Sequence, residues 1–440
     1  MSLVVPSIED IRKHLKFETF NAIQKEAIEK SKDANELVVL APTGSGKTIA
    51  FLLPIIQRIN PNLKEVQCVI VAPSRELSLQ IEQVFKSLGT PLKVNCCYGG
   101  HSMKVEMNNM QNPPHVLIGT PGRLADHIDK ESFDYSAVEA IVLDEFDKAL
   151  EFGFKDDMSF IIEELRSVNF KMLTSATKND ELPEFTKIES PVIIDYLGDQ
   201  VPPKLNLQMV YAKGVDKLYS LLKLICHLKA EPMLIFCNHR AAVDRISEIL
   251  KEKGIAHESF HGGLDQEERE RALTKFRNGS ATVFITTDLA ARGLDIPDIK
   301  HVIHYQLPPK EDAFIHRNGR TARMEKDGDA YLVLSEEDKL PEYIKKKPQN
   351  LHVPSNEEIP PLPKWITLYI SGGKKNKINK IDIVGLLMKK GGLSKDELGL
   401  IEVKDFISFV AVDRKKAKEV CELVNKERVK KIRLRVAIAR

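Results

Sequence analysis

The sequence of 440 residues has little of what marks several common protein classes. Its six cysteines, at positions 68, 96, 97, 226, 237 and 421, form no Cys-x-x-Cys pair, which argues against a zinc site and a disulfide framework. No run of about 18 apolar residues occurs, so no helix is expected to span a membrane. Residues 1–6 lack the basic region and the long apolar core of a secretion signal. We therefore expect a cytoplasmic protein, and we expect it to be a monomer.

Acidic residues are scarce only toward the C-terminal end. Residues 364–440 contain 20 Lys and Arg against 9 Asp and Glu, whereas the preceding residues contain 45 against 54. The formal net charge of +2 thus hides a basic segment attached to an acidic remainder. Such a segment favours an anionic partner, although a merely solubilising surface would have the same composition.

The length is typical of about three domains. Residues 1–200 alternate short apolar strands with helical patterns, and residues 205–345 do so again after a break that contains Gly and Pro. Each part is therefore predicted to be an α/β domain with a parallel sheet. The prolines of residues 346–363 predict an extended tether. Residues 364–440 have the order strand, helix, strand, strand, helix, strand, which fits an α+β split βαβ sandwich.

The expected strands follow the apolar runs of each domain. They cover 37–40, 68–72, 94–98, 115–119, 140–143, 171–174 and 191–194 in the first domain, 233–237, 256–260, 282–286, 301–305 and 330–334 in the second, and 366–371, 400–403, 406–412 and 431–439 in the third, where helices are expected at 380–390 and 414–426.

Residues 41–48 read Ala-Pro-Thr-Gly-Ser-Gly-Lys-Thr and stand between an apolar strand and a helical pattern. This context is typical of a nucleotide phosphate loop, because glycines let backbone N–H groups turn toward phosphate oxygens at a helix N-terminus. Lys47 is predicted to reach the β- and γ-phosphates, and Thr48 to hold Mg²⁺. The expected cradle consists of Thr43, Gly44, Ser45, Gly46, Lys47 and Thr48. The alternative is a chance surface turn, and Ala41 stands where the general pattern has Gly.

A second apolar strand, 140–143, is followed by Asp144-Glu-Phe-Asp147. Open α/β sheets bind ligands at the carboxyl ends of their strands. Asp144 is therefore predicted to complete the shell of Mg²⁺, and Glu145 to orient or deprotonate a water molecule. An acidic quartet after a strand is otherwise more typical of a solvated turn, and only its pairing with the loop at 41–48 indicates a metal site.

Further short motifs occur in a characteristic order, and with them residues 8–335 resemble the DEAD-box family of ATP-dependent RNA helicases. The motifs are Ile23-Gln24, 41–48, Pro73-Ser-Arg-Glu-Leu77, Gly99-Gly100, Thr120-Pro-Gly-Arg123, Asp144–Asp147, Ser175-Ala-Thr177, Ile235–Asn238, Gln266–Arg269, Thr287–Asp295 and His316–Arg323. The resemblance implies two tandem RecA-like domains and an ATP hydrolase that acts on RNA with ATP and Mg²⁺ as cofactors.

The same resemblance implies roles for single residues. Besides the loop and Asp144, nucleotide contacts are implied for Phe17, Gln24, Gly293, Asp295, Arg320 and Arg323. Contacts with the RNA backbone are implied for Pro73, Arg75, Gly100, Thr120, Pro121, Gly122, Arg123, Arg269 and Thr287. Coupling of hydrolysis to strand separation is implied for Asp147, Ser175, Thr177 and His316.

The catalytic group is expected to comprise Lys47, Glu145, Arg320 and Arg323. The two arginines are three residues apart, so on a helix they would share one face and could act as arginine fingers on the γ-phosphate. The alternative for them is pairing with nucleic acid or with carboxylates.

Several motifs depart from the family pattern: Ala322 replaces the usual Gly of the last motif, and two further departures bear on the nucleotide site. Phe146 replaces the usual Ala of the acidic box, and we expect its ring to need room near Ser175–Thr177 and the facing domain while hydrolysis survives. The motif around Gln24 has Phe20 and Asn21 in place of Pro and Thr, so Phe17 is the remaining candidate for stacking on adenine.

Residues 364–440 resemble the RNA-binding domain of the bacterial DbpA subgroup, an RRM-like fold that recognises a hairpin of large-subunit ribosomal RNA. The third strand keeps Phe406 and Phe409 but lacks the Arg/Lys-Gly-Phe start of sheets that stack bases. We therefore place phosphate contacts on Lys374, Lys375, Lys377 and the basic stretch 430–435. A solvated run of charge is the alternative.

The sequence thus predicts an RNA-stimulated ATPase and RNA helicase that acts in large ribosomal subunit assembly, with RNA as its partner and no membrane. Two alternatives stay open. One is an ATP-dependent RNA clamp that holds RNA without unwinding it, and the weaker one is a DNA-translocating helicase.

Overall fold

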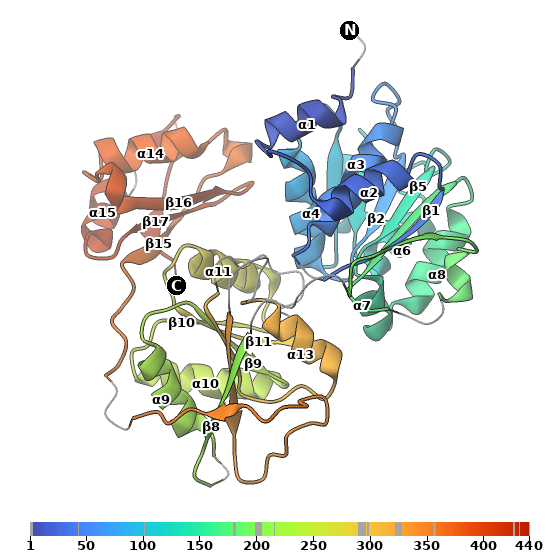
Figure 1. Ribbon diagram of the computed structural model, residues 1–440. Coiled ribbons are helices and arrows are strands. Elements are labelled where there is room, and N and C mark those ends of the chain that lie inside the picture. Colours follow the sequence, from blue (N-terminus) through green and yellow to red (C-terminus); the bar gives the residue numbers. More distant parts are fainter. Residues whose placement is uncertain are drawn as a thin grey trace. The chain divides into compact units, whose positions relative to one another are not determined.

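The computed structural model describes residues 3–42, 44–100, 102–178, 182–198, 205–214, 216–288, 296, 299–321, 328–354, 358–425, 427–430 and 432–439. The described residues divide into two compact units, one formed by those up to 198 and the other by those from 205 onward. The first unit is an α/β domain. The second contains another α/β domain and the C-terminal domain (Figure 1).

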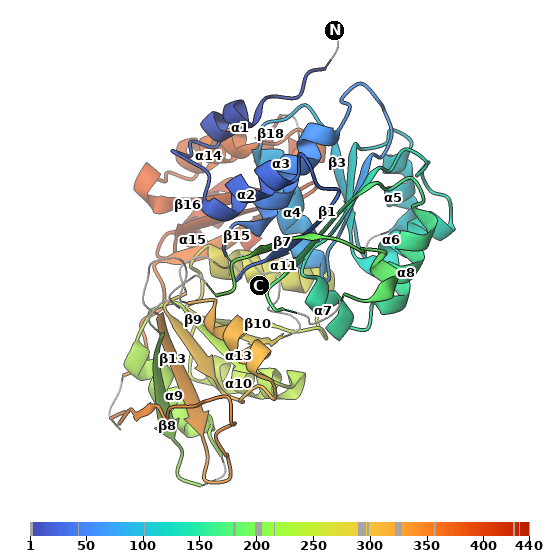
Figure 2. The same ribbon diagram turned by 45° about the vertical axis from the view of Figure 1, so that its right-hand side comes forward.

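A seven-stranded parallel sheet with helices on both faces forms the first unit (Figures 1 and 2). Its strands, in the order β3-β4-β2-β5-β6-β1-β7, are β1 (Glu36–Leu40), β2 (Cys68–Val71), β3 (Val94–Cys97), β4 (Val116–Gly119), β5 (Ala140–Leu143), β6 (Phe170–Ser175) and β7 (Val192–Asp195). Its helices are α1 (Ile8–His14), α2 (Ala22–Lys30), α3 (Lys47–Arg58), α4 (Arg75–Ser87), α5 (Met103–Met110), α6 (Pro121–Asp129), α7 (Phe146–Glu151) and α8 (Lys155–Glu164), with a 3-10 turn at Glu184–Thr186.

The residues of β1 explain the two helical layers. Leu37 and Val39 pack into the core shared with α1 to α4, whereas Val38 and Leu40 face the core shared with α6, α7 and α8. All four side chains are buried. A parallel strand covered on both faces is therefore a continuous apolar run rather than an alternating one.

The second α/β domain repeats this architecture. Its parallel sheet, in the order β10-β11-β9-β12-β13-β8-β14, has β8 (Leu205–Tyr211), β9 (Met233–Cys237), β10 (His257–Phe260), β11 (Val283–Thr287), β12 (His301–His304), β13 (Gly328–Leu334) and β14 (Gln349–Asn350). The helices are α9 (Leu218–Leu228), α10 (Arg240–Glu252), α11 (Gln266–Arg277) and α13 (Glu311–Asn318).

The C-terminal domain is an antiparallel sheet with two helices on one face. The sheet has the order β16-β17-β15-β20, and its elements are β15 (Trp365–Ile370), α14 (Lys380–Lys389), β16 (Leu398–Val403), β17 (Ser408–Asp413), α15 (Ala417–Val424) and β20 (Val436–Ile438), with a hairpin of β18 (Arg428–Val429) and β19 (Ile432–Arg433) and 3-10 turns at Lys374–Asn376 and Lys395–Glu397. Leu368 and Val410 of the sheet share a core with Leu387 and Val420 of the helices.

The opposite face of this sheet lies against α11 and the turn that follows it. Thr367 of β15 is only 1% exposed, and its hydroxyl hydrogen-bonds with Asn278 Nδ2 at 3.1 Å and with Ser280 Oγ at 2.7 Å. Lys404 forms an ion pair with Glu270 of α11 at 2.6 Å. The two domains of the second unit therefore share a specific polar interface.

The strands expected in the two α/β domains are all confirmed, and the structure adds β8 and β14. The start of the expected tether is not free, because Gln349–Asn350 pairs with β8 and the Leu351 N–H donates to the Met209 carbonyl at 2.8 Å. The single strand expected at 431–439 is wrong. Lys430 adopts φ +48° and turns the chain between β18 and β19, and β20 begins only at Val436.

Candidate nucleotide and RNA site

Apart from Ile23-Gln24 on α2, the predicted motifs of the first unit lie at or after the carboxyl ends of its parallel strands. The loop 41–48 follows β1, residues 175–177 end β6, and residues 144–147 follow β5, and these three strands are neighbours in the sheet. Residues 73–75 follow β2 and residues 120–123 follow β4, which are neighbours on the other side of β5. One edge of the sheet thus carries the predicted phosphate site beside the predicted RNA contacts, as expected for open α/β sheets.

The loop 41–48 has the backbone that an anion cradle needs. Gly46 adopts φ +90° at the N-cap of α3, a conformation that favours glycine, and a Cβ atom there would come within 2.7 Å of Gln24 Nε2. Within the described residues the buried Ser45 hydroxyl has no hydrogen-bond partner. This unsatisfied donor at a helix N-terminus fits a bound phosphate. Thr43 lies outside the described residues.

Lys47 is held inside the loop. Its side chain is buried, and its ammonium group donates to the carbonyls of Ala41 and Pro42. Burial lowers the pKa of Lys47, and the nearby carboxylates of Glu145 and Asp144 oppose that shift. The charge of this lysine is thus poorly solvated without a ligand, and an anionic phosphate would compensate it.

The motif around Gln24 braces this loop. Asn21 caps α2, its side chain accepting from the Gln24 N–H at 3.0 Å, while its Nδ2 donates to the Ser45 carbonyl at 2.8 Å. Gln24 Oε1 accepts in turn from the Asn21 N–H, which completes a reciprocal cap. Gln24 Nε2 donates to the Gly46 carbonyl at 3.4 Å. Both ends of the Gln24 amide therefore have partners in the chain. The sequence did not predict a role for Asn21, although Asn is a strong helix N-cap.

The acidic box places two carboxylates beside the loop. Asp144 is buried and accepts from the Thr174 hydroxyl of β6, and burial together with Glu145 raises the pKa of Asp144 to about 6. Glu145 adopts φ +47°, and its N–H donates to Thr174 Oγ1 at 3.1 Å. One threonine thus positions both acidic residues. The sequence did not predict Thr174, because a threonine inside a strand is unremarkable.

Three of the four residues assigned to coupling, Asp147, Ser175 and Thr177, are joined by hydrogen bonds. Thr177 donates through its hydroxyl to Asp147 Oδ2 at 3.0 Å, and its N–H donates to Ser175 Oγ at 3.0 Å. The turn after β6 is therefore tied directly to the acidic box. His316 lies on α13 of the second unit and is half-buried.

The Phe146 ring is accommodated inside the first domain. It is 1% exposed and packs in the core of that domain, with its centroid 6.1 Å from that of Phe185. The expectation that the ring also needs room near the facing domain stays a prediction. Phe146 opens α7, and helix geometry turns its side chain toward the sheet.

Two predicted RNA contacts form one cluster. The guanidinium of Arg75, the first residue of α4, lies against the turn at Gly99 and Gly100, where a Cβ atom added to Gly100 would come within 2.7 Å of Arg75 Nη1. Gly100 adopts φ +90°, a backbone conformation that favours glycine. Pro73 precedes this helix.

The third predicted motif, Thr120 to Arg123, begins α6 with Thr120 as N-cap and Pro121 as the first helical residue, followed by Gly122. Arg123 Nε lies 3.6 Å from Glu106 Oε2, and the same oxygen lies 2.9 Å from His127 Nε2. Glu106 is buried and anchors this arginine. The sequence offered no signal for Glu106, which belongs to α5 and meets α6 only in the fold.

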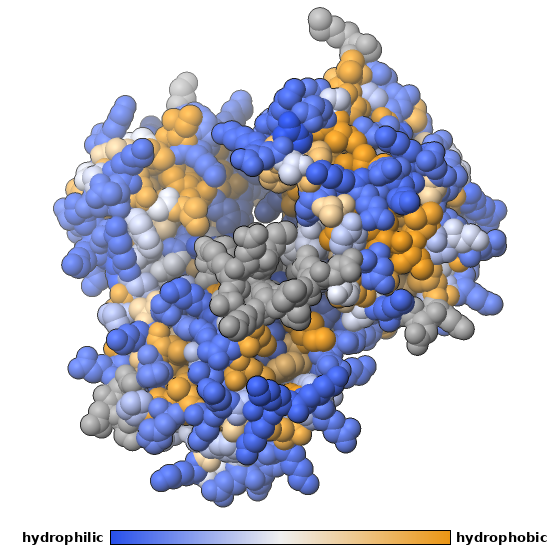
Figure 3. Space-filling view, viewed as in Figure 1, coloured by the Kyte–Doolittle hydropathy of each residue, from blue (hydrophilic) through white to orange (hydrophobic). Residues whose placement is uncertain are grey.

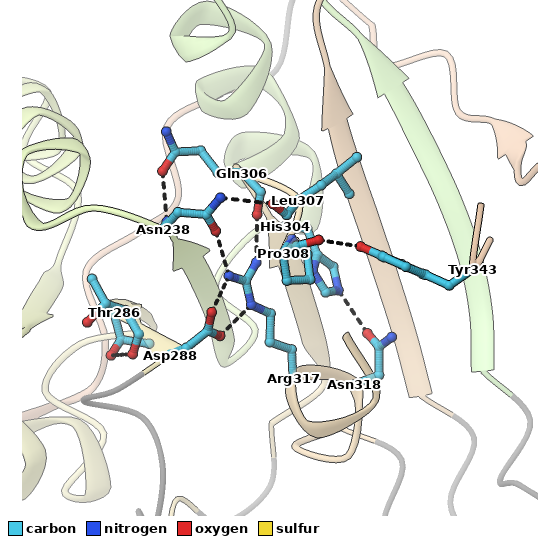
Figure 4. A network of polar contacts seen from close by, with 11 residues as sticks. Asn238, Thr286, Asp288, His304, Gln306, Leu307, Pro308, Arg317, Asn318 and Tyr343 are labelled. Atoms are coloured by element: carbon cyan, nitrogen blue, oxygen red, sulfur yellow. Dashed lines mark hydrogen bonds and ion pairs between the residues drawn. The ribbon is translucent and has the colours of Figure 1, made fainter. Parts of the chain in front are cut away.

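A buried arginine organises the motifs of the second α/β domain (Figure 4). Arg317 of α13 is 2% exposed and donates to both carboxylate oxygens of Asp288, to Asn238 Oδ1 at 2.8 Å and to the Gln306 carbonyl at 2.6 Å. Asp288, Asn238 and Gln306 follow β11, β9 and β12, so one side chain joins three strand ends. Arg317 was not singled out in the sequence.

The remaining candidates of this domain lie around that network. Thr287 ends β11, and Arg269 lies in the first turn of α11, where its Nη2 donates to Gln266 Oε1 at 2.6 Å. Arg320 is buried in the turn after α13, which ends at Asn318, so the expectation that Arg320 lies on a helix is wrong. Gly293, Asp295 and Arg323 lie outside the described residues.

The candidate stacking residue of the first unit, Phe17, is 37% exposed and contacts Phe20 edge to face at 6.4 Å. In the C-terminal domain, Phe406 is 66% exposed, whereas Phe409 is buried on the sheet face that also carries Tyr369 and Thr367, opposite the face that packs on the helices.

The lysines assigned to phosphate contact are exposed. Lys374 and Lys375 lie in a 3-10 turn, and Lys377 is its C-cap residue. Hydrophilic residues line the rim of the visible face of the domain (Figure 3). Lys430 of the basic stretch pairs with Asp382 at 2.6 Å. Among the helices of the described residues, none combines the length and apolar character needed to span a membrane.

Three family models match the chain: DEAD/DEAH box helicase at residues 21–185, helicase conserved C-terminal domain at 215–325, and DbpA RNA binding domain at 367–438. The ATP-dependent RNA helicase DbpA of Bacillus subtilis is 29% identical over 94% of this chain and 93% of its own length. The ATP-dependent RNA helicase CshA of Listeria monocytogenes is 33% identical over 78% of this chain and 68% of its own.

Two solved structures show the same core fold. Dbp5 of S. cerevisiae, bound to RNA and ADP BeF3, is 27% identical with a TM-score of 0.70, covering 78% of this chain and 92% of that one. Mss116p, bound to ssRNA and AMP-PNP, is 27% identical with a TM-score of 0.69, covering 79% and 77%.

Proposed function

Because the chain belongs to the DEAD-box family of ATP-dependent RNA helicases, we propose that it hydrolyses ATP to unwind short RNA duplexes locally during assembly of the large ribosomal subunit. The observation that carries the proposal is the placement of the phosphate loop, the acidic box and the RNA motifs along one edge of the first sheet. The basic C-terminal domain, which matches the DbpA RNA binding model, supports a ribosomal RNA target and hence work in the cytoplasm.

The nucleotide site would act through a small set of side chains. Mg²⁺ bound with ATP would neutralise charge that develops on the phosphates. Thr48 and Asp144 would hold the ion, and Lys47 would bind the phosphates in place of its contacts with carbonyl groups. Glu145 would orient or deprotonate the attacking water, with its backbone fixed by Thr174.

The arginines assigned to the transition state belong to the second unit. Arg320 and Arg323 would therefore reach the γ-phosphate only when the two α/β domains close on ATP, and RNA that binds both domains would favour closure. RNA would thereby stimulate hydrolysis. The hydrogen bond between Thr177 and Asp147 would transmit changes at the acidic box to the turn after β6.

Two assays on the same protein test the proposal. RNA-stimulated release of phosphate measures the ATPase, and displacement of a labelled strand from a short RNA duplex measures unwinding. Stimulated hydrolysis without displacement would identify a clamp, and equal stimulation by DNA would identify a DNA-dependent enzyme. The clamp stayed open in the sequence because of the bulky Phe146. That argument is weaker in the structure, because the Phe146 ring lies in the core.

A further inference from the structure

A groove of about 680 Å³ follows β20, the edge strand of the C-terminal sheet, where that sheet meets α11. Its walls come from both domains of the second unit. Arg271 belongs to α11, Tyr369 to β15 and Lys418 to α15, and Arg435 precedes β20. None of these residues belongs to the motifs that indicated the nucleotide site or the core RNA contacts.

The charge of the groove favours an anionic ligand. Three cations, Arg271, Lys418 and Arg435, face one carboxylate, Glu422. Lys418 and Arg435 are exposed, and no ion pair engages them in the part of the chain that the structure describes. Cations from two domains that surround one groove raise the local concentration of anions.

The groove also offers an aromatic surface. The Tyr369 ring is half-buried and meets the buried Phe409 edge to face, with centroids 6.1 Å apart, so its orientation is fixed from one side. The middle of this sheet face is covered, because Thr367 is bonded to the turn after α11. Tyr369 therefore presents an aromatic surface beside the interface rather than on an open sheet.

The third feature is the strand edge. β20 pairs with β15 on one side, and no strand of the described residues pairs with its other side. There the Val436 N–H already donates to Asn425 Oδ1 at 3.4 Å, so the remaining backbone polar groups of that side are the ones available to a ligand. Proteins that bind single-stranded RNA combine these elements: aromatic rings that stack on bases, cations at phosphates and polar groups at base edges.

We propose that this groove binds a nucleotide of single-stranded RNA, with the base against Tyr369 and the flanking phosphates at Arg271, Lys418 and Arg435. The inference rests on the proposed action on RNA and adds a composite site shared by the helicase core and the C-terminal domain. Arg269, an implied RNA contact of the core, lies on the same helix two residues before Arg271. Residues two positions apart on a helix do not share a face, so the groove is separate from the contact predicted for Arg269.

Binding of a labelled single-stranded uridine decamer to the full-length protein without ATP, followed by fluorescence anisotropy, tests the site. Tyr369→Leu is expected to weaken binding roughly 5- to 100-fold, the range for loss of one base–aromatic stack. Tyr369→Phe retains the ring and should bind like wild type. Arg271→Gln should weaken binding several-fold although it lies outside the C-terminal domain, whereas Lys253→Gln, an exposed cation of the same α/β domain, should not.

Crosslinking of a decamer that carries 4-thiouridine to the unmodified protein gives a readout that requires no folded variant. Adducts at Tyr369 or at residues 435–439 support the groove. Adducts only elsewhere, together with unchanged affinity in Tyr369→Leu and Arg271→Gln, overturn it. ATPase stimulation by duplex RNA is measured separately: its absence in a protein that binds the decamer through the groove refutes the proposed function and leaves this site standing.

Discussion

At Glu145 a non-glycine residue is held at φ +47° and ψ +49°, a conformation that costs about 1–3 kcal/mol and persists only when its surroundings fix it. The bond from its N–H to Thr174 provides that constraint. Strain of this kind is frequent at active sites. The geometry therefore agrees with the assignment of Glu145 to the attacking water.

Glu145→Gln is expected to bind ATP and RNA and to lose roughly 10²–10⁴-fold in hydrolysis rate, because the amide cannot accept the proton of water. Filter binding and phosphate release on the same preparation check this. Glu139→Gln, at an exposed position before β5, is the matched control and should hydrolyse ATP normally. Turnover within a few-fold of wild type in Glu145→Gln would refute the assignment.

Asp144 gives a prediction about pH. Its pKa is raised in the folded protein to about 6, above the ordinary value of 3.8. The contribution of this carboxyl to the free energy of unfolding is therefore highest below pH 3.8, where the carboxyl is protonated in both states, and it falls as pH rises through 6. Without nucleotide, Asp144→Asn should therefore gain about 1.4 kcal/mol of stability relative to wild type between pH 5 and pH 7.5.

Thermal unfolding of both proteins at the two pH values measures this difference. Exposed Asp33→Asn is the control, with the same chemical change and no expected pH effect. A constant difference between wild type and Asp144→Asn across this range would contradict the raised pKa.

At the scale of single elements, Phe146 shows how a motif residue can serve the core. Phe146→Ala restores the residue usual for the family, yet here it would leave a cavity beside Phe185. The first domain should lose about 3–5 kcal/mol, while hydrolysis at low temperature persists. Denaturant unfolding followed by a probe in the first domain checks this. Phe406→Ala removes an exposed ring and should have no effect.

Most strands of the two α/β domains could be predicted, because they are buried on both faces and therefore appear in the sequence as apolar runs, as β1 does. β8 is largely exposed or half-buried, with only Met209 and Val210 buried, and it follows a polar break, so its apolar pattern was weak. β14 has only two exposed residues, Gln349 and Asn350, and exists because β8 offers a free edge. Pairings of this kind depend on tertiary contacts that propensity does not contain.

The candidate site could also be predicted only in part. Residues next to strand ends, such as Lys47 and Asp144, follow from local context. Glu106, Thr174 and Arg317 were missed because their roles depend on partners far along the chain, such as Arg123 for Glu106 and Asn238 for Arg317. A polar residue that supports another has no local signature of its own.

At the scale of the whole molecule, catalysis is divided between units. Arg320→Ala is expected to lower RNA-stimulated hydrolysis roughly 10³–10⁵-fold, the contribution of an arginine finger in related phosphoryl transfers. ATP binding to the first unit should persist. Phosphate release with saturating RNA, alongside binding of a fluorescent ATP analogue, measures both. Wild-type turnover would exclude the role.

The C-terminal domain should confer RNA selectivity on a core that is predicted to contact only the RNA backbone. Simultaneous change of Lys374, Lys375 and Lys377 to Glu should raise the concentration of a ribosomal RNA fragment needed for half-maximal ATPase, with little effect on random RNA. Changing Lys345, Lys346 and Lys347 to Glu gives the same charge difference at three exposed positions outside the domain, and is the control. Selectivity should also fall steeply with salt, because each phosphate contact releases a counterion. If the two triple variants behave alike, bulk charge rather than a defined surface attracts RNA.

This test is cleaner than removal of residues 364–440, because deletion would also expose Asn278 and Ser280, which Thr367 now covers. The buried interface makes the C-terminal domain part of the second unit, so RNA bound there is held beside α11 and not at the end of a free tether.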